Sequence, residues 1–154
     1  MPIDDDKMSR LPEALRPVVS LWFDRLEEAH GRPALAEDIE DQLLRVVAVS
    51  EFAGNALLRD WDYWRGRLEH LSSPPDLDEL KALTDDGGCG EASLEEAKSR
   101  LRRFRHRYML NVLWREVAGI AELDETLGSL SALADQMLAA AGRYAEARLE
   151  ERYG

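Results

Sequence analysis

Residues 93–120 read SLEEAKSRLRRFRHRYMLNVLWREVAGI, and this stretch decides the fold class. It opens with a capping box, in which the Ser93 hydroxyl accepts a hydrogen bond from a first-turn amide while Glu96 accepts one from the amide of Ser93. The residues that follow are mostly good helix formers, with no proline and no strand-like alternation of apolar and polar side chains. The stretch therefore predicts one long helix that continues to about Ala121.

The apolar residues of this helix occupy two faces. At 100° per residue, an N-terminal set lies on one side and a C-terminal set lies nearly opposite. The two sets are Leu94, Ala97, Leu101, Phe104 and Tyr108, followed by Leu110, Leu113, Trp114, Val117 and Ile120. The buried face thus changes near Tyr108, which predicts either a helix bent within one bundle or a helix that also serves another partner.

The same helix carries five arginines in eight residues, namely Arg100, Arg102, Arg103, Arg105 and Arg107. Guanidinium groups form paired hydrogen bonds with carboxylates and phosphates. Acidic residues on either side could neutralise some of this charge, so a solvated or internally paired face is one interpretation. The other is a contact with a domain or partner, for which we expect Arg100, Arg103 and Arg107 to be responsible.

The rest of the chain is also expected to be helical, which makes the protein all-α. Asp124 is expected to cap a last helix, so that residues 94–154 form a long antiparallel helical hairpin. Residues 72–93, rich in Ser, Pro and Gly, are expected to be a loop with one short helix, Leu77–Leu83. A small orthogonal helical bundle is expected over residues 11–71, with helices at 11–30, 35–49, 51–58 and 61–71, the last two capped by Ser50 and Asp60. Residues 1–10 are expected to be a flexible lead-in.

The composition excludes several classes of protein. The chain has 154 residues, the length of one domain, and a formal net charge of −11, which repels phosphate backbones and argues against a nucleic-acid partner. Its single cysteine, Cys89, cannot form an intrachain disulfide. The absence of a signal-peptide pattern and of an apolar run near 18 residues predicts a cytoplasmic protein without a membrane partner.

No residue is expected to be catalytic, cofactor-binding or metal-binding. The pairs Asp60/Asp62 and Asp76/Asp78 match the Asp-x-Asp pattern of nucleotidyl-transfer enzymes, but residues i and i+2 diverge on a helix. Both pairs are better explained as residues of helix starts. Gly87–Gly90 lacks the Lys-Ser or Lys-Thr of a phosphate loop, and the three histidines show neither zinc spacing nor a Cys-His signature.

Four blocks of sequence carry a family resemblance. They are Leu101–Arg105 (LRRFR), Met109–Gly119 (MLNVLWREVAG), Leu127–Asp135 (LGSLSALAD) and the upstream Ser50–Asp60. In order and spacing these blocks resemble the N-terminal helical region of the bifunctional glutamine synthetase adenylyltransferase and adenylyl-removing enzyme, over roughly residues 11–147. The resemblance implies that a nucleotidyltransferase domain, missing here, would follow the hairpin.

The resemblance also implies a function for the complete protein. That enzyme transfers AMP from ATP to a tyrosine of glutamine synthetase and removes it by phosphorolysis, with magnesium, under control of a nitrogen-signalling protein. This chain would be a non-catalytic scaffold whose partners include the downstream domain. The alternative hypothesis is a free-standing α-helical protein-interaction module.

Overall fold

The computed structural model describes residues 5–78, residue 80 and residues 93–154, and every regular element in them is helical. The all-α class is therefore confirmed. The α-helices are α1 (Asp5–Ser9), α2 (Arg16–His30), α3 (Glu37–Val49), α4 (Glu51–Arg59), α5 (Trp61–Trp64), α7 (Leu94–Val117) and α8 (Leu123–Tyr153). Two 3₁₀ helices, η1 and η2, cover Glu13–Leu15 and Leu68–Ser72. None of these helices combines the length and apolar character that crossing a membrane requires.

The contacts divide the chain into two units that do not follow chain order. Unit 1 comprises Met1–Ser73 and Leu113–Ala121, and unit 2 comprises Pro74–Val112 and Glu122–Gly154. Helix α7 thus contributes its first part to unit 2 and its last turns to unit 1. This division explains the change of apolar face that the sequence shows near Tyr108, because each part of the helix has its own core to cover.

Unit 1 is built on tryptophans that use both their apolar surface and their N–H group. Trp22 of α2 is buried against α4, and its Nε1 donates to the carbonyl of Gly54 over 2.8 Å. Trp114 is fully buried and donates to the side-chain oxygen of Gln42 in α3 over 2.7 Å. A buried indole N–H needs an acceptor of this kind, so these bonds help fix which helices meet.

Short-range signals explain several helix ends in the structure. The Ser50 hydroxyl accepts from the amide of Ala53 and caps α4, as predicted. Gly31 has φ 74° after α2 and Gly119 has φ 70° after α7, a left-handed conformation that glycine adopts easily. The prediction that the long helix reaches Ala121 is therefore wrong by one turn, because the Gly119 conformation ends it at Val117.

Two predicted helices of unit 1 are interrupted. The helix expected over residues 61–71 is instead α5 and η2, separated by a turn around Gly66, whose missing side chain weakens a helix. Asp60 was expected to cap it, but its side chain makes no capping hydrogen bond to α5. The helix expected from residue 11 begins at Arg16, after η1. Asp124 lies in the first turn of α8, whose N-cap is Glu122.

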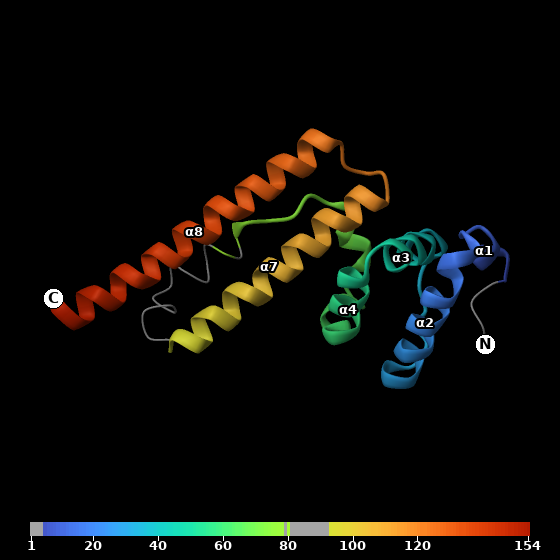
Figure 1. Ribbon diagram of the computed structural model, residues 1–154, viewed down its shortest axis with the longest axis horizontal. Coiled ribbons are helices and arrows are strands. Elements are labelled where there is room, and N and C mark those ends of the chain that lie inside the picture. The colour runs from blue at the N-terminus through green and yellow to red at the C-terminus, as the bar shows by residue number, and fades with distance from the viewer. Residues whose placement is uncertain (1–4, 79, 81–92) are drawn as a thin grey trace. The chain divides into compact units, whose positions relative to one another are not determined.

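Unit 2 contains α8 and the first part of α7, which Figure 1 shows side by side and antiparallel. Their contact is a cluster of buried residues to which α7 contributes Phe104, Tyr108 and Val112, and α8 contributes Leu133 and Ala140. Leu80 completes the cluster. The short helix expected over residues 77–83 lies mostly outside the described residues.

Candidate functional site

The three arginines that the sequence singled out lie on one side of α7. Arg100, Arg103 and Arg107 are spaced by three and four residues, so they form a stripe along the helix. Arg100 and Arg103 are exposed, and Arg107 is partly buried. The stripe borders the face of α7 that is buried through Phe104 and Tyr108. It is therefore a row of three cations, two of them exposed, on a helix whose neighbouring face is anchored.

The capping box lies one turn before this stripe. The backbone N–H of Ser93 donates to Glu96 Oε2 over 2.8 Å, and the N–H of Glu96 donates to the Ser93 hydroxyl over 3.3 Å, as predicted. Hydrogen bonds from the backbone N–H and the side chain of Ser93 to the Glu96 carboxylate, followed by the charge of Arg100, hold the pKa of Glu96 below its ordinary value. Glu96 is therefore ionised at neutral pH. Its negative charge interacts with Arg100, the first arginine of the stripe.

Residues of both Asp-x-Asp pairs make local contacts in the structure. Asp62 is exposed and lies 3.5 Å from Arg65, one turn later in the chain. Asp76 accepts from the backbone N–H of Asp78 over 2.8 Å, which is a local turn contact. Across the part of the chain that the structure describes, no three Asp, Glu, His or Cys side chains gather as metal ligands would. Gly87–Gly90 and Cys89 lie outside that part.

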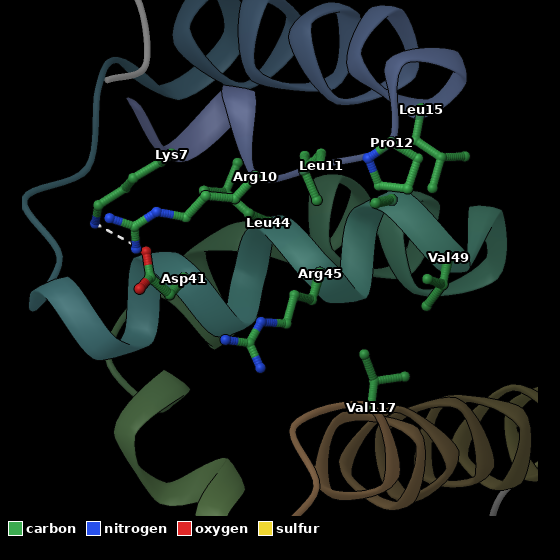
Figure 2. Close-up of a pocket in the computed structure, with 11 residues that line it drawn as sticks. Lys7, Arg10, Leu11, Pro12, Leu15, Asp41, Leu44, Arg45, Val49 and Val117 are labelled. Carbon is green, nitrogen blue, oxygen red and sulfur yellow. Dashed lines mark ion pairs between the residues drawn. The ribbon is translucent and has the colours of Figure 1, made fainter. Parts of the chain in front are cut away.

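A groove of about 500 Å³ lies in unit 1 (Figure 2). It lies between α1, the segment of residues 11–15, helix α3 and Val117. Its charged lining residues are Lys7, Arg10, Asp41 and Arg45, and its apolar ones are Leu11, Pro12, Leu15, Leu44, Ala48, Val49 and Val117. Figure 2 shows Lys7, Arg10 and Asp41 at one end and Leu15, Pro12 and Val49 at the other.

Lys7 closes the charged end of this groove. Its side chain is only 8% exposed, and its ammonium lies 2.7 Å from Glu40 Oε2 and 3.1 Å from Asp41 Oδ1. Burial alone would lower the pKa of Lys7, but the hydrogen bonds and charges of Glu40 and Asp41 outweigh it and raise the pKa above its ordinary value. Lys7 is therefore an anchor that is satisfied by α3, which leaves it little capacity to bind a ligand.

The charged end of the groove was not predicted from the sequence. We expected residues 1–10 to be a flexible lead-in, yet residues 5–9 form α1 and Lys7 is buried against α3. Three successive aspartates before Lys7 favoured a solvated segment, whereas the carboxylates that bind Lys7 are more than 30 residues away. Only a contact prediction between the two segments could have found the pair.

Comparisons with known proteins agree on one family. Residues 40–154 match the family described as glutamate-ammonia ligase adenylyltransferase. The chain is 34% identical over 149 residues to the bifunctional glutamine synthetase adenylyltransferase/adenylyl-removing enzyme of Thioalkalivibrio sulfidiphilus, with 94% of the chain covered. The enzyme of the same name from Pseudomonas aeruginosa is 36% identical over 124 residues, or 77% of the chain. No solved structure gives a significant match.

The chain matches only a small share of each relative. It spans 15% of the Thioalkalivibrio protein and 12% of the Pseudomonas protein. The family match nevertheless covers most of the chain and includes all of α7 and α8. It favours the first of the two hypotheses drawn from the sequence over a free-standing interaction module. This chain is a member of the glutamate-ammonia ligase adenylyltransferase family.

Proposed function

We propose that this chain is a non-catalytic helical region of an enzyme that adenylylates and deadenylylates glutamine synthetase. The observation that carries the proposal is the family match over residues 40–154, since the relatives bear the name of that enzyme. The complete enzyme would transfer AMP from ATP to a tyrosine of glutamine synthetase and remove it by phosphorolysis. Because this enzyme would act on glutamine synthetase, a metabolic enzyme, we place the chain in the cytoplasm. Its single cysteine cannot form an intrachain disulfide, which fits a reducing compartment.

Under this proposal the chemistry belongs to other parts of the enzyme. Phosphoryl transfer depends on metal ions and positioned charges that stabilise the transferred group. ATP and magnesium would bind in the nucleotidyltransferase domain. Two aspartates of this chain that match the Asp-x-Asp pattern make local contacts. Asp62 faces Arg65, and Asp76 accepts from the chain two residues later. The chain would instead support and orient the catalytic domain.

The arginine stripe is the surface that we assign to this docking role. Arg100 and Arg103 are exposed on a helix that the α7–α8 cluster anchors, so their guanidinium groups are presented with limited loss of backbone entropy. A partner rich in carboxylates would pair with them. The downstream nucleotidyltransferase domain is the first candidate, followed by glutamine synthetase and the nitrogen-signalling protein.

The docking role is tested by adding this chain to the Thioalkalivibrio relative from which the matching region has been removed. We expect Arg103→Glu combined with Arg107→Glu to weaken association at least about tenfold, measured by calorimetry. Lys98→Glu is a matched control on the same helix, since Lys98 is exposed and pairs only with neighbouring Glu95 among the described residues. Circular dichroism should show unchanged helix content in both variants.

The opposite pattern would contradict the assignment. If the double variant melts at a much lower temperature while association is unchanged, the arginines belong to an internal ion-pair network. A separate assay should find that the chain alone neither adenylylates nor deadenylylates glutamine synthetase with magnesium and ATP or phosphate. Activity that disappears in Asp60→Asn or Asp62→Asn would show that these carboxylates are catalytic.

A further inference from the structure

Helix α7 belongs to both units of the chain. The boundary between the units falls after Val112, inside the continuous helix Leu94–Val117. The chain also passes from one unit to the other after Ser73 and after Ala121, and both of these passages lie outside the helices. The passage within α7 is therefore the helical one of the three.

The part of α7 that belongs to unit 1 is too short to be a stable helix by itself. It has five helical residues, 113–117. Each amide of an α-helix donates to the carbonyl four residues earlier, so the amides of residues 113–116 donate to carbonyls of residues 109–112, which belong to unit 2. An isolated helix shorter than about 12 residues is marginal in water, because its first turn is costly to form. These turns therefore depend on the part of α7 that unit 2 holds.

Unit 1 in turn depends on these turns. Trp114 is fully buried, and its indole N–H donates to Gln42 in α3. Arg115 is also buried, and its guanidinium donates to the carbonyl of Ser72 at the end of η2. Both side chains would leave their partners if the turns unwound, and buried polar groups without partners are strongly destabilising.

Unit 2 holds the preceding turns through a core of its own. Phe104, Tyr108 and Val112 of α7 pack in the cluster that includes Leu133 of α8. Val112, an anchor of unit 2, is only two residues from Trp114, the anchor of unit 1. No turn of α7 at the boundary can therefore unwind without exposing an anchor of one core or the other.

We propose that α7 couples the folding of the two units, so that unit 1 keeps its structure only while unit 2 holds the preceding turns of α7 helical. Any ligand that stabilises unit 2 then stabilises unit 1 as well. The coupling runs through backbone hydrogen bonds and buried side chains of α7. It is therefore independent of the docking role assigned to the exposed arginines.

Urea unfolding of the 154-residue chain tests the coupling, because all four tryptophans, at positions 22, 61, 64 and 114, belong to unit 1. Leu133→Ala removes a buried side chain from unit 2 alone. It should lower the midpoint of tryptophan fluorescence by about 1 M urea, together with the midpoint of circular dichroism. Leu138→Ala is the matched control on α8, since Leu138 is 73% exposed, and it should shift neither midpoint. A fluorescence midpoint that Leu133→Ala leaves unchanged would overturn the proposal.

A pair of insertions tests whether the coupling requires a continuous helix. Two glycines inserted after Val112 interrupt α7 at the boundary and should lower the fluorescence midpoint by about 1 M urea. Two glycines inserted between Pro74 and Pro75 lengthen a non-helical passage between the same units. This control should change the midpoint little, because a longer loop costs little free energy. Equal midpoints for the two insertions would show that unit 1 does not need the continuous helix and would overturn the proposal.

Discussion

At the scale of single residues, the hydrogen bonds that were predicted correctly are those between near neighbours in the chain. The capping box of Ser93 and Glu96 and the cap formed by Ser50 each span three residues. Such patterns need only the local backbone, so composition and spacing suffice to find them. Asp60 fits the same pattern but its side chain does not cap α5, because its backbone (φ −124°, ψ 34°) is not in the extended conformation typical of an N-cap residue.

The lowered pKa of Glu96 predicts a pH-dependent contribution to stability. Folding favours the ionised form, so the contribution is complete above the ordinary pKa of glutamate and disappears as pH falls through the lowered pKa. Glu96→Ala should therefore lower the melting temperature at pH 7, and the difference from wild type should shrink as the pH falls below the ordinary pKa of glutamate. Glu95→Ala, one residue earlier, is the control. A difference that stays constant as the pH falls would contradict the role of the carboxylate.

Lys7 predicts a larger effect on stability. Lys7→Ala removes the buried partner of Glu40 and Asp41 and should lower the free energy of unfolding by about 1–3 kcal/mol, measured by urea denaturation. Lys98→Ala removes an exposed pair with Glu95 and should change it by less than about 0.5 kcal/mol. If both variants unfold at the same urea concentration, α1 is not anchored through Lys7. The raised pKa of Lys7 means that its contribution is lost only as pH rises through that value.

At the scale of elements, close approach between helices depends on small residues that only the structure identifies. A side-chain carbon added at Gly54 would lie 3.1 Å from the Trp22 ring. The missing side chain therefore lets α2 and α4 come close enough for the Trp22 hydrogen bond to the carbonyl of Gly54. The sequence shows only a glycine inside a short helix, where it weakens the helix.

This contact predicts opposite effects for two glycine substitutions. Gly54→Ala should lower the free energy of unfolding by about 1–2 kcal/mol, since displacement of Trp22 outweighs the gain in helix propensity. Gly128→Ala is the matched control in α8, where an added carbon meets nothing within 4 Å, and it should stabilise by about 0.5–1 kcal/mol. Thermal denaturation measures both. A stabilising Gly54→Ala would show that Trp22 moves aside without loss.

At the scale of the whole molecule, two properties matter: the net charge of the chain and the division of α7 between two units. The formal net charge of −11 acts over the entire surface, although α7 carries a local row of arginines. The path of the chain divides α7 between two units, so one helix contributes to two cores. The net charge and the division into units both depend on many residues together rather than on any single contact.

The net charge predicts the response to nucleic acid. A labelled duplex of about 20 base pairs should show no change in fluorescence anisotropy with this chain at physiological salt, because repulsion of the whole protein outweighs the arginines. Binding that weakens steeply with salt and is abolished by Arg103→Glu would contradict this. Lys98→Glu serves as the control for reversal of a single positive charge on the same helix.

The sequence by itself determined the all-α class, the capped start of α7, the change of its apolar face and the family. These features follow from local periodicity and from residue patterns that a chain carries whether or not it is folded. Only the tertiary structure decided the division into units, the anchoring of Lys7 by Glu40 and Asp41, and the contact of Trp22 with Gly54. Each of these depends on residues some 30 or more positions apart, and their partners are selected by packing and by the need to satisfy buried polar groups.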